Sequence, residues 1–256
     1  MTEFLVFSDL DGTLLNHQTY SFREARPALD LLAEKGIPLI LASSKTAAEV
    51  AELHAEIGLG DTPAIIENGA GIYRPGAEVQ SDAAYRALRM SLDAVPDRLR
   101  AGFRGFGDMT VDEIAKLTGL TPEAAARARQ RRHSEPGLWL GNDADRDEFL
   151  ASLAGSGITG RSGGRFLSLS YGRTKADGLL EIAAEYRARR TLALGDAPND
   201  VELLQAADIG VIVRNDHGPG IPPLTGEAEG HIRRTTLQGP AGWAEAVTAI
   251  VNEMME

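Results

Sequence analysis

The amino-acid sequence predicts an α/β protein in which a parallel sheet carries a second, smaller α/β domain as an insertion. Three observations lead to this fold class. Strand and helix patterns alternate through the first 68 residues, the alternation returns over residues 173–213, and the residues from about 80 to 168 differ in charge. Strands that alternate with helices form right-handed crossovers, and such crossovers build a parallel sheet.

The first strand is predicted at residues 4–10, an apolar run that ends at Asp-Gly. An uninterrupted apolar run suits a strand that is buried on both faces. The helix that follows is expected to begin at Arg23 or Glu24, because Pro27 then lies in the first turn, where its missing N–H costs nothing. Gly36 suits the end of this helix.

The next crossover follows the same pattern. Residues 37–42 predict a second strand, and Thr46 with Glu49 forms a capping-box pattern for a helix that extends to about Ile57. Residues 64–67 predict the third strand. Beyond residue 173 we expect, in order, a helix over 174–189, a strand over 191–194, a helix over 199–206, a strand over 209–213 and a last helix over 242–255.

The middle of the chain is predicted to form the inserted domain. Residues 82–165 hold 13 of the 26 Lys and Arg residues but only 12 of the 37 Asp and Glu residues. We therefore assign residues 1–80 and 169–256 to the larger domain and residues 81–168 to the insertion. The elements expected in the insertion are a helix at 83–100, a strand at 101–106, helices at 111–117 and 122–131, a strand at 137–140, a helix at 144–154 and a strand at 165–170.

Composition excludes several classes of protein. The chain is 43% hydrophobic and 25% charged, has a formal net charge of −11 and contains no cysteine. A duplex would repel this charge, so we expect no nucleic-acid partner. The absence of a long apolar run and of a basic leader predicts a cytoplasmic protein without a membrane partner. Cysteine nucleophiles and thiolate metal sites are excluded, and nothing indicates an oligomeric state.

Polar residues that follow the predicted strands, and a lysine at the start of the helix that resumes the core, are the candidate functional residues, because ligands of an open parallel sheet bind beyond the carboxyl ends of its strands. In chain order they are Asp9, Asp11, Ser43, Lys45, Lys175, Asp196, Asn199 and Asp200. Taken singly, each suits a helix cap, a turn or a solvated surface. Four carboxylates at one edge, however, repel each other unless a cation lies among them, and oxygen ligands favour Mg²⁺. A hard cation beside a lysine and a serine can neutralise a phosphate.

These residues resemble the motifs of the haloacid dehalogenase superfamily of aspartyl-phosphate phosphatases. Residues 9–13 (D-L-D-G-T) are similar to its first motif, Ser43 to its second, Lys175 to its third and residues 195–200 (G-D-A-P-N-D) to its fourth. The resemblance implies a Rossmann-like core. An insertion between the second and third motifs resembles the C2-type cap domain of the Cof-like branch.

Segments of the insertion, and one segment shortly before it, resemble within that branch the mannosyl-3-phosphoglycerate phosphatase family. They are E-N-G-A-G-I-Y at 67–73, G-F-G-D-M at 105–109, L-T-G-L at 117–120, R-R-H-S-E-P at 131–136 and G-G-R-F at 163–166. The resemblance implies a Mg²⁺-dependent hydrolase that acts on a phosphorylated sugar or glycerate substrate through a phospho-aspartate.

The resemblance also implies a role for each candidate residue. Asp9 would be the nucleophile and Asp11 the general acid and base, assisted by Ser43 and Lys175. The implied Mg²⁺ ligands are Asp9, Asp11, Asp196, Asn199 and Asp200. The implied substrate-binding residues are Ser43, Lys45, Asn68, Arg132, Ser134, Glu135 and Arg165.

Two other functions fit the same core residues. A phosphomutase of the same branch shares the four motifs but returns the phosphoryl group to a sugar instead of to water. A non-catalytic receiver module also combines clustered acids with a Ser or Thr and a Lys. A receiver needs about half this length and has no insertion, so the size of the chain disfavours it.

Overall fold

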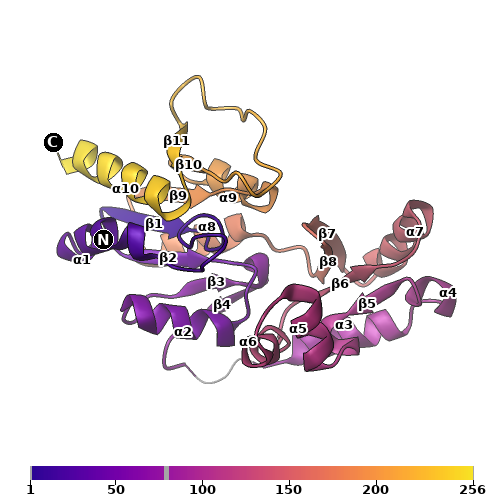
Figure 1. Ribbon diagram of the computed structural model, residues 1–256. Helices are drawn as coiled ribbons and strands as arrows, with labels where there is room; N and C mark the ends of the chain where they lie inside the picture. The colour runs from indigo at the N-terminus through magenta and orange to yellow at the C-terminus, as the bar shows by residue number, and fades with distance from the viewer. Residues whose placement is uncertain (1, 78–80, 256) are drawn as a thin grey trace.

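A computed structural model of the chain describes residues 2–77 and 81–255. Two sheets divide it into a larger core and a smaller domain that we call the cap (Figure 1). The core sheet has the strand order β11-β10-β9-β1-β2-β3-β4, and its strands are parallel except for the antiparallel pair β3 and β4. Its strands are β1 (Phe4–Ser8), β2 (Leu39–Ala42), β3 (Ala64–Ile66), β4 (Gly71–Tyr73), β9 (Arg190–Gly195), β10 (Ile209–Arg214) and β11 (Ile232–Gln238).

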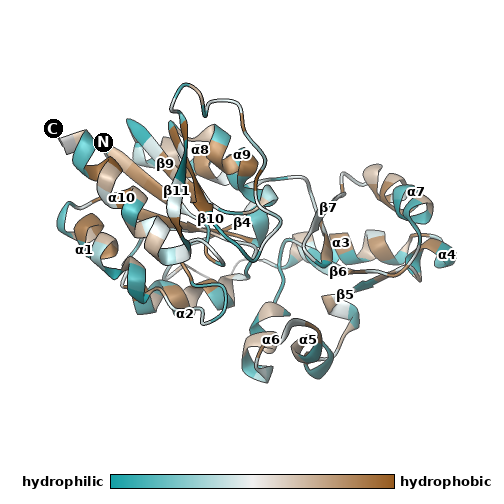
Figure 2. Ribbon diagram, turned by 45° about the horizontal axis from the view of Figure 1, so that its top comes forward, coloured by the Kyte–Doolittle hydropathy of each residue, from teal (hydrophilic) through white to brown (hydrophobic). Residues whose placement is uncertain are grey.

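Helices cover both faces of the core sheet, as predicted for parallel strands. They are α1 (Arg26–Glu34), α2 (Ala47–Ile57), α8 (Lys175–Tyr186), α9 (Val201–Ala206) and α10 (Gly239–Met255). Alternate residues of β1 point to opposite faces. Phe4 and Val6 pack with α1, α2 and α10, whereas Leu5 and Phe7 pack with α8 and α9. Figure 2 shows the resulting apolar strands between helices that turn polar faces outward.

Local signals in the sequence explain where these helices begin and end. Pro27 lies in the first turn of α1, after a short 3₁₀ turn at Arg23–Ala25. Thr46 and Glu49 form the predicted capping box of α2, and Gly58 ends that helix in a left-handed conformation. The predicted α/β class and the parallel core are therefore confirmed.

The cap is an antiparallel sheet with helices packed against it. Its strand order is β5-β6-β8-β7, with β5 at Phe103–Gly105, β6 at Glu135–Trp139, β7 at Thr159–Gly163 and β8 at Phe166–Ser170. Its helices are α3 (Ala83–Asp93), α4 (Asp97–Arg100), α5 (Val111–Thr118), α6 (Pro122–Ala128) and α7 (Asp143–Ala154). Phe103 and Phe149 anchor the cluster under α3, α4 and α7, and a second cluster around Phe106 holds α5 and α6.

Several elements differ from the sequence prediction. The single helix predicted over 83–100 is two helices, because Pro96 has an extended ψ of 133° and cannot continue α3. The short or polar strands β4, β7 and β11 were not predicted, because they lack an apolar run. The sheet of the cap includes β8 as far as Ser170, two residues beyond the predicted boundary. The boundary after residue 80 adjoins residues 78–80, which lie outside the described residues, so the exact domain limits stay a prediction.

The cap lies beyond the carboxyl ends of β1, β9 and β10 (Figures 1 and 2). Helix α6 contacts α2, and Arg127 forms an ion pair of 2.9 Å with Glu52 there. Arg161 of β7 reaches Glu202 of α9 at 2.7 Å. The two domains therefore meet on both sides of the edge where ligands of a parallel sheet bind. No helix among the described residues has the length and apolarity needed to span a bilayer.

Candidate active site

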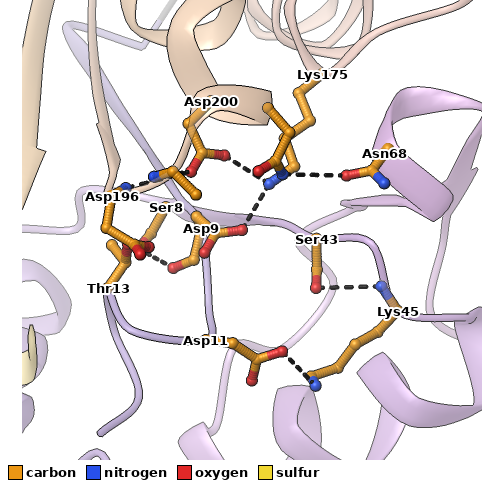
Figure 3. Close-up of polar contacts among 12 residues, drawn as sticks. Ser8, Asp9, Asp11, Thr13, Ser43, Lys45, Asn68, Lys175, Asp196 and Asp200 are labelled. Carbon is orange, nitrogen blue, oxygen red and sulfur yellow. Dashed lines mark hydrogen bonds and ion pairs between the residues drawn. The ribbon is translucent and has the colours of Figure 1, made fainter. Parts of the chain in front are cut away.

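Asp9 and Lys175 form the centre of the site. Asp9 follows β1 directly, and a capping box at Thr174 fixes the start of α8 so that Lys175 is its first residue. Lys175 Nζ donates hydrogen bonds to Asp9 Oδ1 at 2.5 Å and to Asp200 Oδ1 at 2.7 Å (Figure 3). Both the Lys175 ammonium and the Asp200 carboxylate are buried. One ammonium therefore bridges two loops of the core.

Three buried carboxylates converge at this point. Asp9, Asp196 and Asp200 each offer an oxygen, and these oxygens lie within 4.8 Å of one another. Burial raises the pKa of Asp9 well above its usual range, and the neighbouring Asp200 raises it further. Burial also raises the pKa of Asp196. Burial alone would lower the pKa of Lys175, but Asp200 and Asp9 outweigh it and hold that pKa above its usual range. One ammonium cannot balance three carboxylates, and this oxygen-only donor set fits a hard divalent cation.

Asp196 is held by two residues that the sequence prediction missed. Thr13 Oγ1 donates to Asp196 Oδ1 at 2.5 Å, and Asn215 Nδ2 donates to Asp196 Oδ2 at 2.7 Å. Gly12 precedes Thr13 with φ of +90°, and a Cβ at this position would collide with Asn215 and Asp196. Asn215 follows β10 directly, so the strand-end rule that found the other residues also indicates this one.

Asp11 is paired with Lys45 beside this cluster. Lys45 Nζ lies 2.6 Å from Asp11 Oδ2, and the backbone N–H of Lys45 donates to Ser43 Oγ at 3.2 Å. Burial alone would lower the pKa of Lys45, but Asp11 outweighs it and raises that pKa. The predicted residues Ser43 and Lys45 thus lie together at the end of β2, next to Asp11 (Figure 3).

Asn68 and Asn199 form a hydrogen-bonded pair at the edge of the site. Asn199 Nδ2 donates to Asn68 Oδ1 at 3.3 Å. Asn68 has a left-handed backbone (φ +59°), as does Gly69 (φ +94°). A Cβ at Gly69 would collide with the backbone of Thr174, so this turn closes directly on the start of α8. The glycine permits the close approach that brings Asn68 to the site.

The substrate-binding residues predicted in the cap lie in different surroundings: Ser134 and Arg132 contact the core, whereas Arg165 is exposed. Ser134 Oγ donates to the core residue Glu67 at 2.7 Å, and the backbone N–H of Arg132 donates to Glu67 at 3.0 Å. Arg165 is exposed in the turn between β7 and β8, with its guanidinium over the Phe166 ring.

Glu135 differs from the substrate role predicted for it. Its buried carboxylate accepts hydrogen bonds from Tyr85 Oη at 2.5 Å, from the Gly107 N–H at 2.7 Å and from Arg89 at 3.3 Å. A buried carboxylate needs such donors, so this side chain organises the interior of the cap. Burial raises its pKa.

Comparison with known families gives the site its context. A model of haloacid dehalogenase-like hydrolases matches residues 6–99 and 145–218. The chain belongs to this family. The membership confirms the resemblance carried by residues 9–13 and 195–200, and with it the Rossmann-like core and the C2-type cap.

A curated relative extends over nearly the whole of this haloacid dehalogenase-like hydrolase. It is the glucosyl-3-phosphoglycerate/mannosyl-3-phosphoglycerate phosphatase of Persephonella marina, 33% identical over 276 residues that cover 98% of each chain. The alignment therefore includes the cap as well as the core.

Solved structures share the two-domain architecture of this hydrolase. A phosphatase of the haloalkanoate superfamily from Bacteroides thetaiotaomicron, BT1666, has a TM-score of 0.68 at 21% identity and covers 98% of this chain and 95% of its own. The sucrose-phosphatase of Synechocystis sp. PCC6803, solved with sucrose and phosphate, has a TM-score of 0.66 at 18% identity and covers 98% and 99%. These likenesses establish the fold of core and cap.

Proposed function

We propose that this haloacid dehalogenase-like hydrolase is a Mg²⁺-dependent phosphatase that transfers a phosphoryl group to Asp9 and then to water. The observation that carries the proposal is the surroundings of Asp9: a buried carboxylate at a strand end, 2.5 Å from the Lys175 ammonium and beside two further carboxylates. Hydrolysis of a phosphate monoester requires on the order of 20 kcal/mol of barrier reduction. A covalent aspartyl phosphate divides this barrier into two smaller steps.

Asp11 performs the proton transfers in this proposal. In the first step Asp9 attacks phosphorus, the bond to the leaving oxygen breaks, and Asp11 donates a proton to that oxygen. In the second step Asp11 takes a proton from the water that attacks the aspartyl phosphate, which releases phosphate and restores Asp9. The proximity of Asp11 to Asp9, two residues on in the same loop, supports this division of roles.

The cation and the remaining polar groups balance the charge of the substrate. Asp9, Asp196, Asp200, the Asp11 carbonyl and Asn199 would hold Mg²⁺. When bound, the ion offsets the repulsion between a dianionic phosphate and Asp9. Lys175 adds a positive charge beside the nucleophile, and Ser43 offers a hydroxyl to a phosphate oxygen.

The proposed substrate is mannosyl-3-phosphoglycerate, which would give mannosylglycerate and phosphate. The Persephonella marina relative is named for glucosyl-3-phosphoglycerate and mannosyl-3-phosphoglycerate, and its alignment includes the cap, so it supports a glycosyl-3-phosphoglycerate substrate. The cap segments at 105–109, 131–136 and 163–166 resemble the same family of phosphatases. We assign Lys45, Asn68, Arg132 and Arg165 to the part of the substrate beyond the phosphate.

A panel of phosphate esters tests the function directly. Phosphate release is measured with Mg²⁺ on mannosyl-3-phosphoglycerate, glucosyl-3-phosphoglycerate, mannose 6-phosphate and glucose 1-phosphate. We expect the two phosphoglycerates to be hydrolysed with the highest kcat/KM. An isomerised sugar phosphate in place of free phosphate would identify a phosphomutase. A stable phospho-aspartate without turnover would identify a receiver-like module.

A further inference from the structure

The Glu67 carboxylate of the core accepts several hydrogen bonds from the cap. Its Oε1 accepts the backbone N–H of Arg132 at 3.0 Å. Its Oε2 accepts the N–H of His133 at 3.2 Å, the N–H of Ser134 at 2.8 Å and the hydroxyl of Ser134 at 2.7 Å. Only 2% of Glu67 is exposed to solvent. Four donors from one cap segment thus converge on a single buried carboxylate.

The two partners of this contact come from different domains. Glu67 follows β3 in the core and directly precedes Asn68 at the site. Residues 132–134 connect α6 to β6 in the cap. The contact therefore spans 65 or more residues of sequence and lies next to Asn68 of the site.

The chemistry of the contact requires a carboxylate. All four partners donate hydrogen bonds, and three successive backbone N–H groups form a concave anion site. A glutamine would offer one oxygen but would turn its NH₂ group toward the remaining donors. Glu67 also has a φ of +49°, a conformation that is uncommon for a long side chain and persists where the surroundings hold it.

Two ion pairs between the domains are far more exposed than this contact. The Glu52 side chain that meets Arg127 is 63% exposed, and the Glu202 side chain that meets Arg161 is 46% exposed. Solvent screens such pairs, so they fix the position of the cap weakly. Single hydrogen bonds also join the domains, from Thr46 Oγ1 to the Arg127 carbonyl at 3.0 Å and from Arg131 to the Ser44 carbonyl at 2.8 Å. Glu67 differs from them because four donors of the cap meet one buried carboxylate.

We propose that Glu67 is a positioning residue that holds the cap closed over the site and sets the backbone of residues 132–134 against the part of the substrate beyond its phosphate. The inference rests on the proposed phosphatase function. A substrate that reaches the cap needs this closed arrangement, whereas a small phosphate ester needs only the residues of the core. Glu67 therefore acts on substrate selection and leaves the chemistry at Asp9 unchanged.

The test compares a large and a small substrate in three variants. Glu67→Gln replaces one of the two acceptor oxygens by a donor, Ser134→Ala removes the hydroxyl donor, and Glu52→Gln is a matched control in the exposed pair. For Glu67→Gln, kcat/KM for mannosyl-3-phosphoglycerate is expected to fall about 10- to 100-fold, mainly through KM, as for lost hydrogen bonds to a charged group. Hydrolysis of p-nitrophenyl phosphate stays within about twofold, which also shows that the variant is folded. Glu52→Gln matches the wild type on both substrates.

Ser134→Ala separates a specific contact from general damage. Alone it lowers kcat/KM for the large substrate by less than Glu67→Gln does, and in the Glu67→Gln background it has little further effect, because the two groups act through one contact. Equal losses on both substrates, or no loss on either, would overturn the inference.

A solution measurement distinguishes failure of the inference from failure of the proposed function. Small-angle scattering on the Glu67→Gln protein is expected to give a larger radius of gyration than the wild type and Glu52→Gln, because the cap opens. If the wild type hydrolyses no phosphate ester, the proposed function fails. The scattering measurement alone then tests whether Glu67 holds the cap in place. An unchanged radius of gyration would then refute it.

Discussion

Lys45 Nζ lies 2.6 Å from Asp11 Oδ2, while Asp11 Oδ1 is buried and has no hydrogen-bond partner among the residues that the structure describes. The Asp11 carboxylate, the proposed acid and base, is therefore held through Oδ2 by the Lys45 ammonium, while its Oδ1 atom has no hydrogen-bond partner among the described residues. This pairing gives Lys45 a function besides contact with substrate. It holds Asp11 in place at the end of β1.

Lys45→Met is expected to slow hydrolysis of every substrate. The variant keeps the aliphatic stem but removes the charge that holds Asp11, and loss of a charge-assisted hydrogen bond of about 1.5–3 kcal/mol corresponds to roughly a 10- to 100-fold fall in kcat. The measurement is kcat on mannosyl-3-phosphoglycerate and on p-nitrophenyl phosphate. A rise in KM restricted to the carboxylated substrate would show instead that Lys45 binds the glycerate.

Asp9→Asn is expected to abolish turnover and leave the protein folded. An amide cannot form the acyl phosphate, so kcat should fall by on the order of 10⁴-fold or more. The free energy of unfolding without metal should be unchanged or higher, because the change removes one of three converging carboxylates. Phosphate release and urea unfolding measure the two effects. Near-normal hydrolysis by folded Asp9→Asn protein would contradict the covalent mechanism.

Asn215→Ala is expected to raise the Mg²⁺ requirement. Its side chain donates to Asp196 Oδ2 at 2.7 Å, and loss of a group that orients a metal ligand commonly weakens metal affinity about 10- to 100-fold. The Mg²⁺ concentration for half-maximal activity should increase, while kcat at saturating Mg²⁺ changes little. Asp216→Asn, in the exposed pair with Arg214, is the matched control. Full activity after exhaustive chelation would contradict a metal requirement.

Much of the core could be predicted from the sequence because its signals are local. The apolar run of β1, the capping box at Thr46 and the position of Pro27 each depend on a few neighbouring residues. The convergence of Asp9 and Asp200 followed from one topological rule about strand ends, and Lys175 was predicted at the start of the helix that resumes the core. The roles assigned to these residues came from resemblance.

The cap was harder to predict, because its contacts connect residues that are distant in sequence. The strand β7 (T-G-R-S-G) has no apolar pattern and forms only because β8 supplies hydrogen bonds along it. Nothing local to Glu135 indicates that Tyr85, 50 residues away, donates to it. Glu67 lay within a segment that the resemblance had singled out, yet its partners at 132–134 could be identified only in the fold.

The buried Glu135 predicts a pH dependence of stability that Tyr85→Phe should enlarge. Burial raises the pKa of Glu135, and the hydrogen bond from Tyr85 partly opposes that rise. The folded state therefore binds this proton more tightly than the unfolded state, so the contribution of Glu135 to the free energy of unfolding falls as pH rises through the folded pKa. Without the Tyr85 donor the pKa of Glu135 rises further, so the free energy of unfolding decreases by a larger amount as the pH rises.

Urea unfolding of Tyr85→Phe from acid to neutral pH measures this effect. The loss of stability should be small where Glu135 is protonated and should reach about 1–3 kcal/mol at neutral pH, the cost of a buried acceptor left without a donor. Tyr171→Phe, at an exposed tyrosine after β8, should match the wild type. A loss that is the same at every pH would show that packing, not the Glu135 charge, explains the variant.

The last prediction concerns recognition of the glycerate carboxylate. A phosphoglycerate substrate carries a carboxylate besides its phosphate, and Lys175 with the proposed cation balances only the phosphate. The carboxylate needs its own cation, and Arg can bind it through two hydrogen bonds. Arg132 and Arg165 of the cap are the candidates, together with Lys45 of the core, which also pairs with Asp11.

Removal of the arginine that binds this carboxylate should raise KM for phosphoglycerates roughly 10- to 100-fold and leave uncarboxylated phosphate esters almost unchanged. Arg132→Ala keeps the backbone N–H that donates to Glu67, so this hydrogen bond of the core–cap contact stays in the variant. Arg165→Ala changes an exposed turn, and Arg161→Ala in the same hairpin is its control. If Arg132→Ala and Arg165→Ala each weaken carboxylated and uncarboxylated substrates equally, the cap does not bind the glycerate, and the enzyme would be assigned to other sugar phosphates.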